Sequence, residues 1–396
     1  MILHLFKVVW NRKRANALIV AEIFVSFLVV FAVSTGALAM ITRWQQPVGF
    51  EWSEVWAISM DLDAGAREDG GDELRATVLR MLSEAAAFPE VESAAVSNTP
   101  PYAFSTSEMT RNHEGRDVTI VVDDVTDDFA KVMGIPMVAG RWFGAEDDAA
   151  QHEPLVIDAN AARALFGAEN PIGQKFEVDR DLHGRVVGVI APYRKDGETS
   201  APKNMMFRRI APNGAYGRMG SNIVVRVRPG TPAQFEETLV RRLQQVAPSM
   251  SFRVRQMEQM RSTAHRMRLT PLIAGGIVGL FLVSMVALGL TGVLWQNVTR
   301  RTREIGVRRA MGAAGATVHR QILSEVVLLT TLATILGVVV VFQLPLLGLF
   351  SLVPTGVFAA GVAGALAAIY SLTVLCALYP SWLASRLTPA DALRYE

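Results

Sequence analysis

Four long apolar segments divide the chain, and a large polar stretch separates the first segment from the second. Each segment is close to the ~20 apolar residues that cross a lipid bilayer as an α-helix. The polar stretch shows the alternating and amphipathic patterns of a soluble α/β domain instead. The pattern therefore predicts a membrane protein with four transmembrane helices, at residues 16–41, 269–295, 322–344 and 357–379.

The polar stretch, residues 42–268, repeats one order of elements near its two ends. Strand, helix and strand are expected at residues 54–60, 73–87 and 91–97, and again at residues 222–227, 232–246 and 251–255. Two similar βαβ halves, at about residues 50–123 and 221–256, are the simplest account of this repeat. They flank an insert at about residues 124–220. We expect the insert to hold strands at 155–158 and 185–190, with a helix at 159–166 between them.

Residues 257–268 are predicted to form a stalk helix that runs directly into the second span, so that span and stalk would move as one rod. Pro271 is expected to mark a bend at the start of the span. The first span contains Ala37-Leu38-Ala39, which mimics a signal-peptide cleavage site. Its apolar run is too long for a signal peptide, however, so we expect it to remain as a span.

Charge sets the orientation of the spans. Short loops rich in arginine and lysine stay on the cytoplasmic side. The link at residues 296–321 is the clearest case, because six arginines outweigh Glu304 there: Arg300, Arg301, Arg303, Arg308, Arg309 and Arg320. Four crossings then put both termini in the cytoplasm, the domain at 42–268 in the periplasm and a short loop at 345–356 outside. The protein is expected in the inner membrane.

The two termini carry basic residues of their own. Residues 1–15 combine aromatic and apolar side chains with four basic ones, which favours an interfacial helix lying in the headgroup layer. A plain basic flank that only sets topology is the alternative. Residues 380–396 are expected to form a cytoplasmic tail.

Composition fits a chain partly surrounded by lipid, with 51% hydrophobic and 19% charged residues. The net charge of +2 gives no indication of a nucleic-acid partner. Cys376, the single cysteine, excludes an intramolecular disulfide and a cysteine metal cluster.

Motifs for catalysis are absent from the sequence. The stretch GAENPIGQK has neither the glycine spacing of a phosphate loop nor a Ser or Thr after its lysine, and the six histidines lack metal-site spacing. Three pairs of aspartates are interpreted as exposed turn and cap residues: Asp123 with Asp124, Asp127 with Asp128, and Asp147 with Asp148. We therefore predict no catalytic, cofactor or metal site in this chain.

Two carboxylates and two glycines lie within the predicted spans. Glu22 and Glu325 would each cost up to ~3 kcal/mol at the bilayer centre, so each needs a reason. Structural anchoring near a helix N-terminus is favoured over a proton relay. Gly275 and Gly279 have the spacing that allows close approach of two helices.

Three stretches carry a family resemblance. The link REIGVRRAMGA, followed by ILSE, resembles the cytoplasmic loop of FtsX/MacB-like ABC transporter permeases. The stretches DDFAKVMGIPMVAGRWF, LVIDANAARALFGAENPIGQKF and GRVVGVIAPYR resemble the periplasmic core domain of the MacB-like branch. The ending YPSWLASRLTPADALRYE resembles that family's C-terminus. Together these stretches occur in the family's order over most of the chain.

The resemblance implies a dimeric permease with four spans per subunit, a split porter-like periplasmic domain and an inserted small domain. A second permease subunit, the same chain or another, is a partner, and a periplasmic adaptor is possible. No ATPase is fused to this sequence, so ATP and Mg²⁺ would be bound by a separate ABC ATPase subunit. The residues expected to contact that ATPase are Arg303, Glu304, Gly306, Arg308, Arg309 and Gly312.

The family is thought to move periplasmic or membrane-extracted substrates by mechanotransmission, without threading them between the spans. The first hypothesis is thus a permease that converts cytoplasmic ATP binding and hydrolysis into periplasmic movement. The alternative is an FtsX-type regulator whose external domain activates a cell-wall hydrolase. A lipoprotein-release permease has the same architecture and is a third possibility.

Overall fold

The computed structural model describes residues 13–61, 71–113, 115–179, 182–214, 218–300, 311, 315–348 and 353–386. The chain divides into two compact units. One comprises Met1–Thr42 with Leu269–Glu396 and is helical, and the other, Arg43–Arg268, contains the strands. The predicted interfacial helix at 1–15 lies outside the described residues except for its last three, which begin the first long helix.

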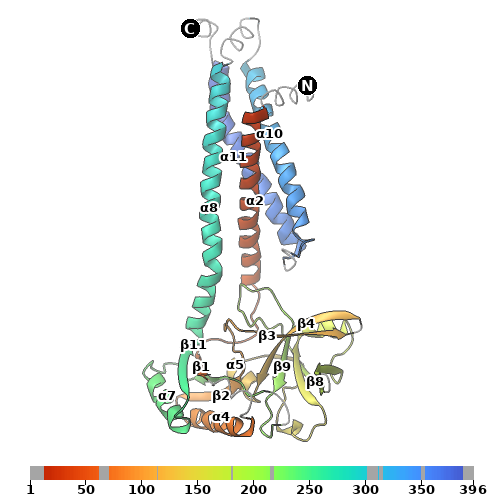
Figure 1. The fold of residues 1–396 in the computed structure, drawn as a ribbon, viewed down its shortest axis with the longest axis vertical. Helices are drawn as coiled ribbons and strands as arrows, with labels where there is room; N and C mark the ends of the chain where they lie inside the picture. The colour runs from red at the N-terminus through yellow and green to blue at the C-terminus, as the bar shows by residue number, and fades with distance from the viewer. Residues whose placement is uncertain are drawn as a thin grey trace. The chain divides into compact units, whose positions relative to one another are not determined.

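Four long helices carry the apolar segments, as predicted. In Figure 1 they are α2 (Lys13–Trp44), α8 (Met257–Arg300), α10 (Gly315–Gln343) and α11 (Thr355–Arg386). Each is long and apolar enough to cross a membrane. Each helix extends past the predicted span at one or both ends. Helix α11 continues to Arg386, so residues 380–386 of the expected tail are helical. Residues 387–396 lie outside the described part.

Helix α8 is one uninterrupted element that belongs to both units. It begins at Met257, at the end of the last strand, and continues through Pro271 to Arg300. The helix is not interrupted at Pro271, which lies inside it and removes one backbone hydrogen bond there. The bend expected at this residue stays a prediction. The predicted stalk and the second span form one continuous helix.

The described strands form one 11-stranded sheet, and its central path runs β11-β1-β10-β2-β4-β9-β6-β8-β5. β3 pairs with β4, and β7 pairs with β8, beside this path. The strands are β1 (Val55–Asp61), β2 (Val91–Ser97), β3 (Ser107–His113), β4 (Arg116–Val125), β5 (Met137–Gly140), β6 (Glu153–Asp158), β7 (Lys175–Asp179), β8 (Leu182–Ile190), β9 (Met205–Arg209), β10 (Asn222–Val227) and β11 (Ser251–Gln256).

The two βαβ halves interleave in the sheet. β1 and β2 are connected by α4 (Gly71–Ala86), and both pair antiparallel with β10, which lies between them. β10 and β11 are connected by α7 (Phe235–Val246), and β1 lies between them. Each half is therefore a split βαβ unit completed by a strand of the other half. Neither half can form its part of the sheet alone.

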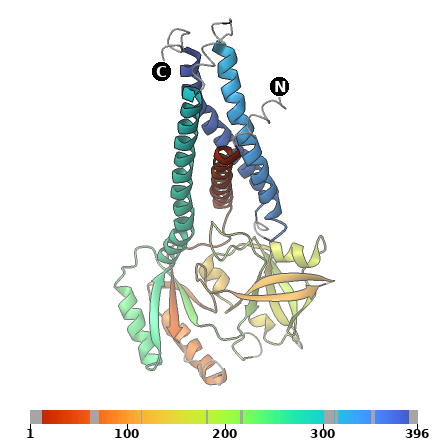
Figure 2. The ribbon, with the colours of Figure 1, turned by 45° about the horizontal axis from the view of Figure 1, so that its top comes forward.

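The alternation of residues along β1 explains the two faces of this part of the sheet. Trp56, Ile58 and Met60 are buried in a cluster with α4 and α7, which lie on the same face of the sheet in Figure 2. Val55 and Ala57 point to the opposite cluster. That cluster also holds α5 (Phe129–Met133) and the beginning of α8, from Met257 to Ala264. The first turns of α8 are thus part of the core of the α/β domain.

The insert has its own core. Its helix α6 (Ala159–Phe166) packs with β6 and β8, and Val118 and Ile120 of β4 belong to the same buried cluster. β4 also runs parallel to β9 of the insert over five residue pairs, whereas it meets β2 at the single pair Ser97–Val125. The β3–β4 hairpin therefore belongs with the insert, and the boundary expected at residue 123 moves to before β3. Val121 and Val125 of β4, by contrast, are buried in the cluster that holds α5 and the beginning of α8.

Candidate functional site

The residues predicted to contact an ATPase, Arg303, Glu304, Gly306, Arg308, Arg309 and Gly312, lie outside the described residues. Residues 296–300, at the start of this link, continue α8. On the far side of the link, α10 begins at Gly315. The two helices that lead into and out of the link are therefore described, and the link itself remains a prediction.

Glu22 and Glu325 lie on α2 and α10, and both are half-buried. Gly289 of α8 faces Glu22: a Cβ atom at this glycine would lie 3.0 Å from the Oε2 atom of Glu22. The absence of a side chain at Gly289 thus leaves room for the carboxylate between the two helices. This arrangement is compatible with the anchoring role predicted for Glu22, and the role itself stays a prediction.

Glycines bring α8 and α11 close to α2. A Cβ atom at Gly275 would lie 3.3 Å from Val33, and one at Gly279 would lie 3.4 Å from Val29. Gly361 of α11 lies even closer, because a Cβ atom there would overlap the hydroxyl of the fully buried Thr35. Small residues allow this approach where van der Waals packing is the main attraction between helices.

A polar cluster of the α/β domain surrounds the carboxylate of Glu198, and we call it the Glu198 hub (Glu198, Arg261, His265 and Tyr102). Arg261 Nε donates to Glu198 Oε1 at 2.6 Å, and His265 Nε2 lies 3.0 Å from Oε2. The Tyr102 hydroxyl lies 3.3 Å from the same oxygen. Glu198 belongs to the insert, whereas Arg261 and His265 belong to α8. The hub therefore ties the insert to the first turns of α8.

The environment keeps Glu198 ionised. Burial alone raises the pKa of its carboxyl, but backbone hydrogen bonding and the donors Arg261 and His265 outweigh burial, so the pKa lies below its usual range. The Arg261 guanidinium also lies 4.2 Å from the centre of the Trp52 ring. A cation between a carboxylate and an aromatic face is held from two sides.

The segment 194–200, which we call the strap, connects the hub to the end of α2. Arg194 is 2% exposed, and its Nη1 atom donates to the backbone oxygens of Arg43, at 2.8 Å, and Gln46, at 3.1 Å. Its Nη2 atom donates to the backbone oxygens of Glu198 and Ser200. The strap thus joins the segment that leaves the first span to the segment that leads into the second.

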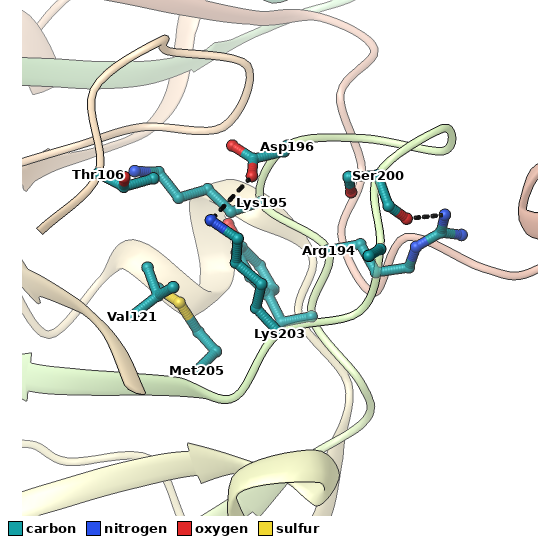
Figure 3. Close-up of a pocket in the computed structure, with 10 residues that line it drawn as sticks. Thr106, Val121, Arg194, Lys195, Asp196, Ser200, Lys203 and Met205 are labelled. Carbon is teal, nitrogen blue, oxygen red and sulfur yellow. Dashed lines mark hydrogen bonds and ion pairs between the residues drawn. The ribbon is translucent and has the colours of Figure 1, made fainter. Parts of the chain in front are cut away.

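A small cavity lies beside the strap (Figure 3) and is lined by Lys195, Lys203 and Met205 among others. Its volume is about 10 Å³, which is room for about one water molecule. Lys203 pairs with Glu108 at 2.8 Å, and the buried Lys195 donates to the backbone oxygen of Ser105. Burial lowers the pKa of Lys195. This cavity is too small for a transported molecule.

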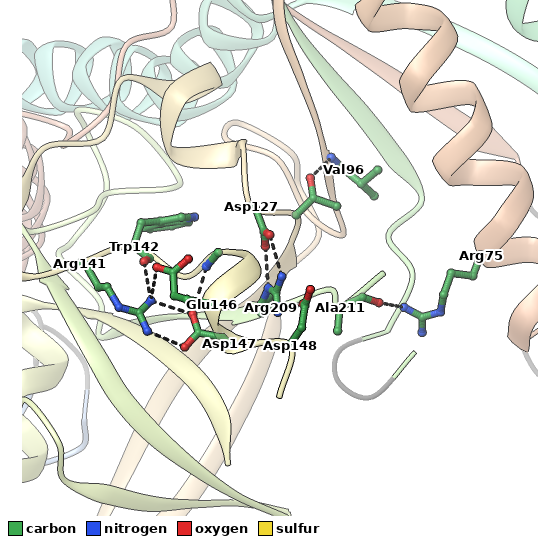
Figure 4. A network of polar contacts seen from close by, with 12 residues as sticks. Arg75, Val96, Asp127, Arg141, Trp142, Glu146, Asp147, Asp148, Arg209 and Ala211 are labelled. Carbon is green, nitrogen blue, oxygen red and sulfur yellow. Dashed lines mark hydrogen bonds and ion pairs between the residues drawn. The ribbon is translucent and has the colours of Figure 1, made fainter. Parts of the chain in front are cut away.

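The interpretation of the aspartate pairs as exposed turn and cap residues is wrong for three of the six residues. Asp123, Asp124 and Asp147 are 1%, 5% and 4% exposed. Figure 4 shows why Asp147 can be buried: Arg141 contacts both of its carboxylate oxygens, at 2.6 and 2.7 Å. Burial raises the pKa of Asp147 but Arg141 outweighs it, so the pKa lies below its usual range. Arg141 lies only six residues before Asp147, whereas Asp124 pairs with Arg208, on a segment that the sequence does not pair with it.

Arg209, at the end of β9, is the centre of the same network. It is 1% exposed and binds both carboxylate oxygens of Asp127, at 2.7 and 2.8 Å, while its Nη1 atom lies 2.7 Å from Asp148. Asp127 and Asp148 lie on the segments that follow β4 and β5. Their positions fix these two loops around the insert, and we assign the network a structural role.

Asp123 should make stability depend on pH. Burial raises the pKa of its carboxyl to about 7, against the charge of Lys195 and hydrogen bonds from Thr99 and Ser97. A carboxyl whose pKa is raised by folding holds its proton more tightly in the folded state. Its contribution is therefore complete below the unfolded pKa of about 4 and is lost as the pH rises through about 7.

The substitution Asp123→Asn removes this titration. Relative to wild type, we expect the variant to gain about 2–3 kcal/mol of stability between pH 5 and pH 8. Thermal unfolding of the full-length protein in detergent at the two pH values measures the gain. A difference in Tm between variant and wild type that stays constant with pH would contradict the assignment.

Sequence reasoning missed the Glu198 hub, although one signal was present. Arg261, His265 and Arg268 are spaced by four and three residues, so they share one face of a helix. The side chain of His265 is only 14% exposed. Nothing in the sequence pairs this face with Glu198.

Among the described residues, no group of three His, Cys, Asp or Glu side chains is placed to hold a metal ion.

Two family models match most of the chain. The model of the MacB-like periplasmic core domain matches residues 16–242, which is more than half of the sequence. The model of the FtsX-like permease C-terminal domain matches residues 276–389. The chain belongs to the FtsX/MacB-like family of ABC transporter permeases.

Relatives of this MacB-like permease include the macrolide export ATP-binding/permease protein MacB of Burkholderia thailandensis, 31% identical over 285 residues, or 70% of this chain and 43% of the relative. MacB of Bordetella avium is 27% identical over 348 residues, or 82% and 50%. The chain spans about half the length of these curated relatives. The crystal structure of the periplasmic region of MacB from Actinobacillus actinomycetemcomitans is 15% identical, covers 56% of this chain and 98% of that one, and has a TM-score of 0.39.

The family assignment confirms the predicted membrane architecture. The sheet-rich domain of this MacB-like permease lies between its first and second spans and is periplasmic, and the other three spans lie in or beside the FtsX-like part. ABC permeases of this family work with an ATPase that is a separate or a fused domain. The Glu198 hub and the strap belong to residues 43–268 and therefore lie on the periplasmic side.

Proposed function

We propose that the chain is the permease subunit of an ABC transporter that works by mechanotransmission. A separate ATPase subunit, which binds ATP and Mg²⁺, drives it from the cytoplasmic side through the link at 296–321. The permease resides in the inner membrane with both termini in the cytoplasm. A second permease subunit completes the transporter, and a periplasmic adaptor receives the movement or the cargo.

One observation carries the proposal: α8 is continuous from Met257, in the core of the periplasmic domain, to Arg300, at the edge of the cytoplasmic link. A helix that is packed at one end and attached to the driven link at the other transmits displacement along its axis. The Glu198 hub passes that displacement to the insert, because Arg261 and His265 of α8 both contact Glu198. No path through the spans is needed for this.

Export is the direction of transport that the names of the relatives indicate, because they are described as macrolide export proteins. We carry over the direction and not the cargo. Conformational change of the periplasmic domain then moves a substrate that is already in the periplasm or in the outer leaflet.

Regulation of a cell-wall hydrolase, as in the FtsX-type branch, is less well supported, because the match of the MacB-like core domain extends to residue 242. Capture of partners with the full-length protein distinguishes the two functions. Recovery of a hydrolase would favour regulation, and recovery of an adaptor or an exported ligand would favour transport. Recovery of lipoproteins would point to lipoprotein release.

The experiment that tests the proposal reverses charge in the link. The double substitution Arg308→Glu with Arg309→Glu should abolish co-purification with the ATPase, or reduce permease-dependent ATP hydrolysis at least tenfold, because two cations at the contact become anions. Arg241→Glu with Arg242→Glu makes the same change of charge on α7 in the periplasmic domain and should have no effect. A wild-type chain that associates with no ATPase would refute the proposal.

A further inference from the structure

The turn that follows α10 presents large apolar side chains on the surface of the protein. Leu346 and Leu347 are 86% and 72% exposed, and Phe342, in the last turn of α10, is exposed as well. The sequence around them is also apolar, because no charged residue occurs between Glu325 and Arg386. Contiguous exposed apolar residues of this kind mark a surface that contacts a protein or a membrane.

The length of α10 sets the depth of this turn. Four spans put the turn on the same side of the membrane as the periplasmic domain. Glu325 is the last charged residue before the turn, and an ionised carboxylate lies at or beyond the edge of the hydrocarbon core. From Glu325 to Gln343 the helix rises by about 27 Å, which is less than the core thickness of about 30 Å. Because tilt only shortens this reach, the turn begins at or inside the outer edge of the core.

The backbone of the turn is suited to an environment with little water. The amide of Leu347 donates to the carbonyl oxygens of Gln343 and Leu344, both at 3.2 Å, and the amide of Gly348 donates to the oxygen of Pro345 at 3.1 Å. Pro345 itself has no amide hydrogen to satisfy. Gly348 adopts a φ of 77°, which a glycine allows without strain. Unpaired backbone groups are what excludes most turns from lipid, and these amides are paired.

We propose that the turn between α10 and α11 is inserted into the outer leaflet, with Leu346 and Leu347 among the lipid acyl chains. The loop expected outside the membrane then begins within it, and lipid covers its apolar side chains. The hydroxyls of Thr331 and Tyr370 lie 2.9 Å apart and tie α10 to α11. Insertion of the turn therefore holds the outer ends of both helices at one depth. The proposal rests on the four-span architecture and does not depend on the proposed transport function.

Spin-label accessibility tests the depth of the turn in the full-length protein, reconstituted into vesicles of phosphatidylethanolamine and phosphatidylglycerol. Leu346→Cys is combined with Cys376→Ser, which removes the native cysteine. Oxygen concentrates among acyl chains, whereas a water-soluble nickel chelate does not enter them. The label at position 346 should collide with the chelate roughly fivefold less often than a label at Val138→Cys, because the bilayer core holds no water. It should collide with oxygen more often.

Val138 is the matched control, because it is an apolar residue, 63% exposed, on β5 of the periplasmic domain. Equal collision with the nickel chelate at positions 138 and 346 would place the turn in water and would overturn the proposal. Low collision of the label at 346 with both oxygen and the chelate would mean that protein covers the turn, either the periplasmic domain or a second copy. That result would overturn the proposal too.

Labels on the outer part of α10 provide an internal scale of depth. Val339 and Phe342 are exposed on the helix that leads to the turn, so Val339→Cys and Phe342→Cys place labels before Leu346 along the same chain. Accessibility to the nickel chelate should rise gradually from position 339 to 346. A jump to the value at Val138 between positions 342 and 346 would refute insertion, whatever the absolute collision rates.

Discussion

Replacement of Glu198 by alanine is expected to loosen the strap from α8 and to destabilise the periplasmic domain by about 2 kcal/mol. The carboxylate is 10% exposed, and it accepts hydrogen bonds from Arg261, His265 and Tyr102. Removing one partner of a buried ion pair costs about 3–5 kcal/mol because the other charge is left uncompensated. The Arg261 side chain is 23% exposed and stacks on Trp52, so water and the ring recover part of this loss.

Hydrogen exchange locates the effect. Amides of residues 194–200 and 257–264 should exchange faster in Glu198→Ala than in wild type, while amides of α4 should be unchanged, because α4 packs in the other cluster of the domain. Glu237→Ala is the matched control. Glu237 pairs with Arg241 on the surface of α7, with both side chains more than two-thirds exposed, and such pairs contribute about 0–1 kcal/mol. Equal exchange in the two variants would show that the hub carries no stability.

The same substitution separates structure from function. If the hub passes movement from α8 to the insert, Glu198→Ala should leave the association with the ATPase intact while transport falls. Glu198→Gln keeps the shape and one acceptor oxygen, so it should lie between alanine and wild type in exchange and in transport. Transport at the wild-type level in Glu198→Ala would exclude the hub from the coupling path.

The elements that the sequence predicts well are those set by local pattern. Strand β2, strand β10 and helix α6 occupy the predicted residues, and four apolar helices occur where the hydropathy places them. Each of these signals lies within one stretch of chain: alternation for a strand, helical spacing for α6, and length for a span. The family resemblance also rests on contiguous motifs, each within one stretch of chain, and it was confirmed.

Long-range pairing was beyond the sequence. The two βαβ halves were recognised, but their interleaving depends on β1 pairing with β10 and β11, across more than 160 residues. The buried aspartates were misread because Asp124, for example, acquires its partner Arg208 only in the fold. The hub was missed because the second βαβ half, residues 221–256, separates Glu198 from Arg261 along the chain. Secondary-structure propensity is a property of a single segment, whereas burial and ion pairing depend on which segments contact one another in the fold.

Gly361→Ala is expected to destabilise the packing of α11 against α2 by about 2–3 kcal/mol. A Cβ atom at this position would overlap the Thr35 hydroxyl and would lie 3.2 Å from the Thr35 Cα atom, so the helices must separate. The Ser34 hydroxyl also donates to the backbone oxygen of Gly361 at 3.4 Å, and that contact would lengthen. In a membrane, closely packed small residues are a main source of helix association.

Gly364→Ala is the matched control, because it lies on the same helix one turn away and a Cβ atom there would meet nothing within 4 Å. Alanine is the better helix former, so this variant should be neutral or slightly more stable than wild type. Thermal unfolding of both variants in detergent, together with the rate at which a disulfide forms between cysteines placed on α2 and α11, measures the separation. If both glycine variants behave like wild type, the close contact between α2 and α11 does not hold in the membrane.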